Sequence, residues 1–148
     1  MSLRDDIARD TKEAMKARDR SRVDALRMLT AALKNGEIEK GRSLIEDEER
    51  AILRRQLKQR EESAEAFRKA GREDQAGAEA AEAEIVRRYL PALLSDEELE
   101  SIVNEAIAQT GATSMRDMSA VMSRASALSG ERADGRRLSA FVRSRLQG

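Results

Sequence analysis

The sequence predicts an all-α protein in which an N-terminal part of long antiparallel helices precedes a small C-terminal domain of three helices. Composition indicates the fold class. Alanine supplies 24 of the 148 residues, and arginine, glutamate and leucine, which also favour helices, are abundant. Proline occurs once and aromatic residues three times. We therefore expect slim helical packing over small side chains, with short apolar stripes at helical spacing and recognisable capping residues.

The first two helices are marked by residues typical of helix ends. Ser2, with Asp5 three residues later, resembles a capping box and predicts a helix start. A second helix is expected to begin near Ser21. Asn35-Gly36 offers a weak stop for this helix, and Gly41 a stronger one, because glycine readily adopts the left-handed conformation that closes a helix.

A third helix begins with the acidic run 46–49, which favours the positive end of a helix dipole, and ends at Gly71. A fourth helix is expected over about 73–90, since Pro91 disfavours helical geometry at the residue before it. Five residues of the third helix recur at steps of four and three, a seam suited to a long partner helix. They are Leu53, Leu57, Arg60, Ala64 and Phe67.

Three shorter helices are predicted after a boundary at 92–95, which divides the chain into parts 1–94 and 95–148. Ser95 with Glu98 opens the first of them, and Gly111 ends it. Ser114 with Asp117 caps the next, whose expected core residues include three methionines, and a loop over 130–135 leads into the last. The expected core residues of these two helices are Met115, Met118, Val121, Met122, Leu138, Phe141, Val142 and Leu146.

The residue types present leave little room for catalysis. Without cysteine and histidine, the chain has no thiolate nucleophile, no imidazole base and no Cys-ligated or His-ligated metal. We expect no catalytic residue, no cofactor and no metal. The acidic run 46–49 is not expected to bind a cation, because four consecutive helical residues point in different directions.

Positive charge is concentrated at the end of a chain whose 28 basic and 28 acidic residues otherwise balance. Residues 132–148 contain five arginines and one acidic residue, a local charge of +4, and the arginine fork suits phosphate oxygens. The candidate nucleic-acid-binding residues are Arg132, Arg136, Arg137, Arg143 and Arg145.

Other interpretations of these basic residues stay open. Basic residues near a helix C-terminus complement the helix dipole and can remain solvated. The turn Ala133-Asp134-Gly135 could gather backbone N–H groups around an anion, or it could be a plain Asp-capped helix start. A second basic stretch, from Lys12 to Arg22, is better explained as a solvated connection between helices.

The chain begins with charged residues instead of a signal peptide, and no apolar run approaches the roughly 20 residues of a membrane span. We therefore expect a cytoplasmic protein with no membrane partner.

Several segments, in order and together covering almost the whole chain, resemble the GatB/YqeY family. The segments are "ALRMLTAALKNGEIEKGR" (25–42), "KQREESAEAFRKAGRED" (58–74), "EAEIVRRYLPALLSDEEL" (82–99), "GATSMRDMSAVM" (111–122) and "RADGRRL" (132–138). One departure from the family pattern is Ile45, which stands where a threonine cap would be expected, and which would weaken the start of the third helix by about 1 kcal/mol.

The resemblance implies an all-α fold and kinship to the tail of the B subunit of tRNA-dependent amidotransferases, which helps to hold tRNA. It therefore implies a non-catalytic, tRNA-binding accessory module. The family label of carbon–nitrogen ligase activity with glutamine as amido-nitrogen donor would be inherited from the larger enzyme. An adaptor that docks on an amidotransferase or an aminoacyl-tRNA synthetase is the alternative. An amide-transfer enzyme in its own right is disfavoured by the missing histidine and cysteine.

Overall fold

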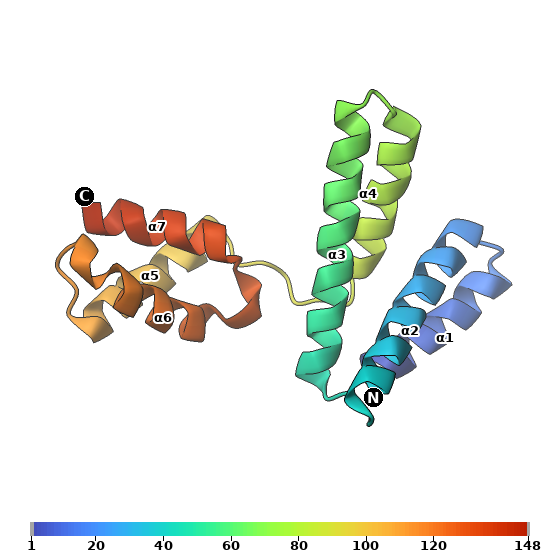
Figure 1. Cartoon of the computed structure of the whole chain (residues 1–148), viewed down its shortest axis with the longest axis horizontal. Helices are drawn as coiled ribbons and strands as arrows, with labels where there is room; N and C mark the ends of the chain where they lie inside the picture. Colours follow the sequence, from blue (N-terminus) through green and yellow to red (C-terminus); the bar gives the residue numbers. More distant parts are fainter. Residues whose placement is uncertain (1, 148) are drawn as a thin grey trace. The chain divides into compact units, whose positions relative to one another are not determined.

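The computed structural model describes residues 2–147, which form seven α-helices and two short 3-10 helices, with no strand (Figure 1). The predicted all-α class is confirmed. The chain divides after Leu90 into two compact units, each with its own hydrophobic core. No helix within residues 2–147 is both long and apolar enough to cross a bilayer.

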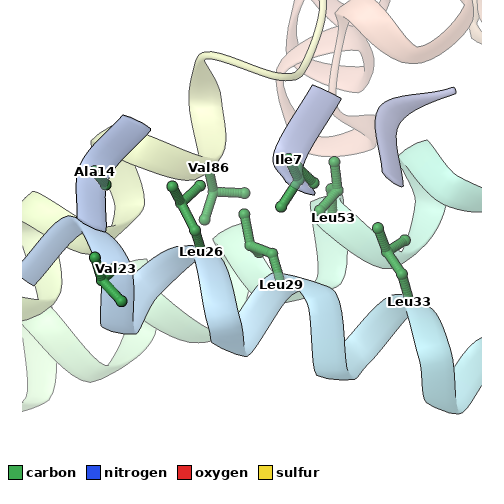
Figure 2. Packing of buried hydrophobic residues seen from close by; sticks show 8 residues of the cluster. All are labelled: Ile7, Ala14, Val23, Leu26, Leu29, Leu33, Leu53 and Val86. Atoms are coloured by element: carbon green, nitrogen blue, oxygen red, sulfur yellow. The ribbon is translucent and has the colours of Figure 1, made fainter. Parts of the chain in front are cut away.

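The first unit contains two pairs of neighbouring helices (Figure 1). The first pair is α1 (Leu3–Lys16) with α2 (Arg20–Lys40), and the second is α3 (Glu46–Lys69) with α4 (Glu73–Arg87). Figure 2 shows the core in which these helices meet, with α2 supplying half of the buried side chains. The residues drawn there are Ile7, Ala14, Val23, Leu26, Leu29, Leu33, Leu53 and Val86.

The predicted ends of the first two helices are confirmed. Ser2 Oγ accepts the N–H of Asp5 at 3.1 Å, and the Asp5 carboxylate accepts the N–H of Ser2 at 3.3 Å. Helix α2 continues through Gly36 and ends at Gly41, whose φ of 71° is left-handed. Gly36 lets α3 approach closely, since a Cβ there would force Cδ1 of Ile52 on α3 to move aside.

Helix α4 ends at Arg87, three residues before the predicted end. Tyr89 and Leu90 form a turn in which their N–H groups donate to Val86 and Arg87, a tighter bonding pattern than that of an α-helix. Pro91 accounts for this change, because its ring disfavours α geometry at Leu90.

The second unit is built from α5 (Asp96–Thr110), α6 (Met118–Ser129) and α7 (Gly135–Gln147), with 3-10 turns η1 (Met115–Asp117) and η2 (Gly130–Arg132). The Ser114–Asp117 capping box opens η1 instead of α6. Met115, predicted to be a core residue, is 39% exposed because it lies in this turn, ahead of the buried stripe of α6. The buried core residues of this unit are Leu94, Leu99, Val103, Ala106, Val121, Ala125, Leu138 and Val142.

Candidate nucleic-acid interface

Asp134 caps the start of α7. Its Oδ1 accepts the backbone N–H of Arg137 at 2.8 Å, and its carbonyl accepts the N–H of Leu138 at 3.0 Å. The Asp-capped interpretation of this turn is therefore confirmed. The backbone N–H of Arg137, which the anion-binding interpretation would direct at an anion, already donates to Asp134.

The side chain of Arg137 fastens α7 to the segment that leads into α5. Its Nη1 donates to the carbonyl of Leu94, and its Nη2 donates to Oδ1 of Asp96, each at 2.5 Å. With a side-chain exposure of 27%, Arg137 is the least exposed of the three tail arginines that form ion pairs. Its guanidinium therefore stabilises the packing of α7 within this unit.

Arg132 and Arg145 also reach α5, but by longer contacts. Arg132 Nε donates to the carbonyl of Ala92 at 2.9 Å, and its Nη2 lies 3.7 Å from the Glu98 carboxylate. Arg145 Nη1 lies 3.7 Å from the Glu100 carboxylate. Hydrogen bonds from Ser95 lower the pKa of Glu98 first, and the charge of Arg132 adds to that lowering. The two ion pairs are exposed and long, so they hold these side chains weakly, but the hydrogen bond to Ala92 also anchors Arg132.

Arg136 and Arg143 are different, because they form no hydrogen bond through their side chains and no ion pair with any residue in 2–147. Both are exposed. They are seven residues apart on α7, so they lie on the same face to within about 20° and about 10 Å apart along the axis. Leu138 and Val142 are buried on another side of the helix.

Arg116 is a third unpaired guanidinium group, on the turn that adjoins α7. It belongs to η1, which contacts α7, and its exposed side chain has no hydrogen bond or ion pair among the described residues. Because α6 and α7 follow each other through the short turn η2, η1 lies near the end of α7 that carries Arg143. The sequence gives no signal for this residue, which stands alone between Met115 and Asp117.

The side chains of the acidic run at the start of α3 point in different directions, and they pair with different basic side chains and N–H donors. Glu46 and Asp47 pair with Arg50, while Glu48 pairs with Arg42 and Lys40. The hydrogen bond from Arg42, followed by that from the Ile45 N–H, lowers the pKa of Glu48 to about 2. Within residues 2–147, no group of three acidic side chains is arranged to hold a metal ion.

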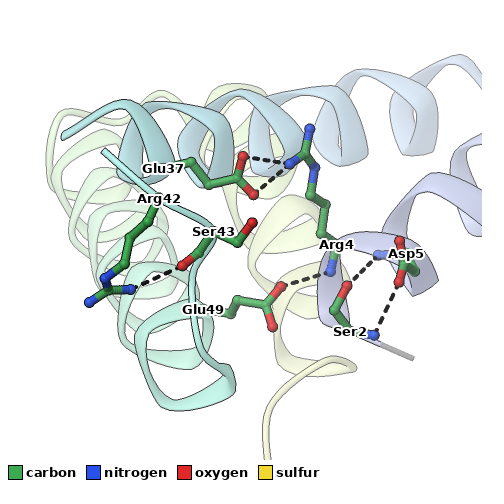
Figure 3. Close-up of polar contacts among 7 residues, drawn as sticks. All are labelled: Ser2, Arg4, Asp5, Glu37, Arg42, Ser43 and Glu49. Carbon is green, nitrogen blue, oxygen red and sulfur yellow. Dashed lines mark hydrogen bonds and ion pairs between the residues drawn. The ribbon is translucent and has the colours of Figure 1, made fainter. Parts of the chain in front are cut away.

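Glu49, the last residue of the acidic run, is a buried carboxylate, which its place in that run does not indicate. It is 3% exposed and accepts the backbone N–H of Arg4 at 3.1 Å, which joins the start of α1 to α3 (Figure 3). The side chain of Arg4 in turn pairs with Glu37 of α2. A signal was present, since Glu49 lies four residues before Leu53, on the same face of the third helix.

The seam between α3 and α4 contains the charged side chain of Arg60, which belongs to the repeating pattern of the third helix. Arg60 Nε lies 3.3 Å from the Glu82 carboxylate, and its Nη1 lies 3.8 Å from that of Glu79. Burial raises the pKa of Glu82, while the charge of Arg60 opposes that rise. Arg60 therefore compensates carboxylates that the hairpin partly buries.

Comparison with known proteins finds a family model that matches nearly the whole chain and a relative that matches 61% of it. The model of a protein family described as Yqey-like protein matches residues 4–146. The chain is also similar to "Altered inheritance of mitochondria protein 41, mitochondrial" from Clavispora lusitaniae, with 36% identity over 92 residues. That alignment covers 61% of this chain and 54% of the relative, so it spans about half of the relative's length.

Proposed function

The chain belongs to the YqeY-like protein family, and from this premise we propose that it is a non-catalytic accessory module that binds tRNA. The module would correspond to the tail of the B subunit of tRNA-dependent amidotransferases. Its contact surface would be the outward face of α7, and it would hold RNA by its phosphates. Amide-transfer activity of the purified chain alone would contradict the proposal.

The observation that carries this proposal is the unpaired state of Arg136 and Arg143. Two exposed guanidinium groups share one face of α7, with Arg116 on the adjoining turn, and none has a partner among the described residues. Guanidinium groups suit phosphate oxygens because their planar N–H forks can donate two hydrogen bonds at once. We name these three residues the outward arginines.

The other three tail arginines differ in how readily they could contact a phosphate. Arg132 and Arg145 are 44% and 47% exposed and lie 3.7 Å from their carboxylates, so Arg145 can turn toward a phosphate at small cost. Arg132 would also have to break its 2.9 Å hydrogen bond to the Ala92 carbonyl. Arg137 stays bound to Leu94 and Asp96, and holds the domain together. The predicted five-residue interface thus becomes two principal contacts, two secondary contacts and one structural residue.

Recognition of a particular base sequence is not expected at this surface. The one aromatic residue of the second unit, Phe141, is partly buried against the core cluster, and a single ring provides no platform on which successive bases could stack. Phosphate contacts fix position without reading sequence. Binding should therefore be weak, sensitive to salt and dependent on the shape of the RNA.

The test is a titration of fluorescent tRNA with the full chain, repeated over a series of salt concentrations. Each phosphate contact contributes roughly −0.7 to −0.9 to the slope of log K against log salt, so the three outward arginines predict a slope of about −2 to −3. The variant Arg136→Gln/Arg143→Gln should weaken binding at low salt and reduce the size of that slope by about 1.5.

The matched control is Arg68→Gln/Arg72→Gln, which removes two exposed charges from the first unit. Neither side chain has an ion pair among residues 2–147, so the two variants differ in the position of the lost charge and not in its amount. The control should bind tRNA as the wild type does. Failure of the wild type to reach saturation at low salt would reject the proposal, as would unchanged binding by Arg136→Gln/Arg143→Gln.

Protein docking is the alternative function, with an amidotransferase or an aminoacyl-tRNA synthetase as the partner. The observation in its favour is the exposure of Ile38 and Ile45, at 69% and 60%, on either side of the connection between α2 and α3. Exposed large apolar side chains can contribute to an interface. A partner that co-purifies after nuclease treatment, and is lost in Ile38→Ser/Ile45→Ser, would favour this function over RNA binding.

A further inference from the structure

The first unit contains a cleft that the proposed function does not use. It has a volume of about 270 Å³ and is lined by residues of α1, of the first turn of α2 and of the end of α4. Polar and charged side chains dominate its wall. They are Asp6, Arg9, Asp10, Arg22, Arg88 and Tyr89.

One side of the cleft is already internally paired. The Tyr89 hydroxyl donates to Oδ2 of Asp10 at 2.5 Å, and Arg9 Nε lies 3.5 Å from Oδ1 of the same carboxylate. Arg9 also lies 3.6 Å from Oδ1 of Asp6. Burial, and then the hydrogen bond to Asp10, raise the pKa of Tyr89, so this hydroxyl keeps its proton at neutral pH. Arg9 therefore pairs with both aspartates and offsets one of their two charges.

The other side of the cleft consists of two arginines without partners. Neither Arg22 nor Arg88 forms a side-chain hydrogen bond or an ion pair with any described residue. Arg22 is only partly exposed, although each guanidinium has five N–H donors that need acceptors. The three arginines and two aspartates of the wall leave a net charge of +1. This side of the cleft therefore has unbalanced positive charge.

The position of Arg22 is fixed by the turn between α1 and α2. Asp19 caps α2 by accepting the backbone N–H of Arg22 at 3.2 Å. Arg18, with a left-handed φ of 56°, forms the sharp part of that turn. The basic stretch from Lys12 to Arg22 therefore ends in an arginine held at the cleft, with exposed charges nearby that would attract an anion.

We propose that this cleft binds a sugar phosphate, with the phosphate held by Arg22 and Arg88 and a sugar hydroxyl donating to Asp6. Asp6 accepts no side-chain hydrogen bond from the described residues, and its ion pair with Arg9 is long at 3.6 Å, so its carboxylate can accept such a bond. The volume supports a small ligand, because drug-sized ligands occupy pockets of roughly 300–1,000 Å³. The site belongs to the first unit and does not depend on tRNA binding by α7.

Tyrosine fluorescence gives a direct readout of this cleft, because Tyr89 is the chain's one tyrosine and tryptophan is absent. The full chain is titrated with ribose 5-phosphate, which does not absorb at the excitation wavelength. We expect a saturable change in Tyr89 emission. Inorganic phosphate should bind more weakly, because it lacks the sugar hydroxyls, and ribose without phosphate should produce no saturable change.

The variant Arg22→Gln/Arg88→Gln should weaken the binding of ribose 5-phosphate at least tenfold. The matched control is Lys16→Gln/Arg20→Gln, which removes the same charge from exposed positions outside the cleft wall. It should bind within about twofold of the wild type. Circular dichroism checks that both variants fold. If the double variant does not fold, the shifts of the Arg22 and Arg88 side-chain Nε–H signals in the wild type serve as the readout.

A short RNA without a terminal phosphate, titrated into Arg136→Gln/Arg143→Gln to remove the contribution of α7, distinguishes the two sources of a sugar phosphate. Its binding at the cleft is followed by the Arg22 and Arg88 side-chain Nε–H signals, because RNA absorbs light that excites Tyr89. Binding of ribose 5-phosphate alone identifies a free phosphate monoester as the ligand, whereas binding of the RNA, with or without ribose 5-phosphate, identifies an RNA backbone. Either result supports the site. The proposal is overturned if neither probe binds saturably, or if Lys16→Gln/Arg20→Gln loses as much affinity as Arg22→Gln/Arg88→Gln. Arg136→Gln/Arg143→Gln should leave the cleft unaffected, which separates this site from the surface of α7.

Discussion

Ile45 begins α3 without the side-chain hydrogen bond that a capping residue usually makes. Its backbone N–H donates to the Glu48 carboxylate at 3.0 Å, so half of a reciprocal capping box is present. The missing half is a hydroxyl at position 45, which would accept an N–H from the first turn of the helix. Because Ile45 is 60% exposed, a change there removes little packing.

We expect Ile45→Thr to raise the free energy of unfolding by about 1 kcal/mol, the usual contribution of a capping hydroxyl. Ile45→Val is the control, since valine has the shape of threonine but no hydroxyl. Urea denaturation measures the difference between the two variants. Equal stability of the threonine and valine variants would show that the start of α3 does not need the second half of the box.

Glu48 should titrate far below the usual range of a glutamate. Its pKa of about 2, against an ordinary value of 4.5, is set first by the hydrogen bond from Arg42. The folded state therefore favours the charged carboxylate. Its stabilising contribution is present above about pH 4.5 and is lost as the pH falls toward 2.

Carbon-13 NMR of the glutamate carboxyl groups measures this pKa directly. Arg42→Gln should move the pKa of Glu48 back toward 4.5, because the first cause of the lowering is removed. Glu48→Gln should flatten the dependence of the unfolding free energy on pH between about 2 and 4.5. An unchanged pKa in Arg42→Gln would contradict the assigned cause, and salt should weaken the whole effect because the pair is exposed.

Between elements, α7 is attached to α5 by arginines that the sequence could equally assign to a ligand. Asp96, Glu98 and Glu100 alternate along the first turns of α5, and each meets a different tail arginine. The outward arginines on and beside α7 meet none of them. The packing of α7 thus divides one basic segment into a structural side and an open side.

Arg137→Ala should lower the free energy of unfolding of the second unit by about 1–2 kcal/mol, because hydrogen bonds that involve charged groups contribute roughly 1.5–3 kcal/mol and Asp96 is largely exposed. Arg136→Ala, one residue away and unpaired, should change stability by less than about 0.5 kcal/mol. Urea denaturation followed by helical circular dichroism compares the two variants. Equal effects would contradict the division of the tail into two sides.

For the whole molecule, the division after Leu90 gives each unit a separate core. Leu26 lies in the core of the first unit, and Leu99 in that of the second; both are 0% exposed. Local stability should therefore follow the unit in which a core residue is changed.

We expect Leu26→Ala and Leu99→Ala each to cost about 2–5 kcal/mol in their own unit, as truncation of a buried leucine usually does. Amide hydrogen exchange of the full chain, resolved by residue, reports the two units separately. Leu26→Ala should reduce protection in the first unit, and Leu99→Ala in the second. Loss of protection throughout the chain from either change would mean that the two cores unfold as one.

The sequence by itself determined the helical class and most of the helix ends. Ser2 with Asp5, Gly41, Ser95 with Glu98, and Gly111 act through hydrogen bonds and backbone angles within a few residues, so their meaning can be read locally. The predicted end of the fourth helix was wrong by three residues, because the effect of Pro91 extends through a whole turn. The likeness to the family likewise depends on the order of segments along the chain.

Only the tertiary structure decided which charged side chains are available to a ligand. Arg137 and Asp96 are 41 residues apart, and Tyr89 and Asp10 are 79 apart. No local pattern can pair them. A count of charges therefore placed five arginines in one group, whereas packing left two of them unpaired on α7. Packing also placed Arg22 and Arg88 in the wall of one cleft. The physical reason is that an ion pair depends on the distance between two side chains in space. That distance is set by how the helices pack, and the apolar stripes alone do not specify which helix packs against which.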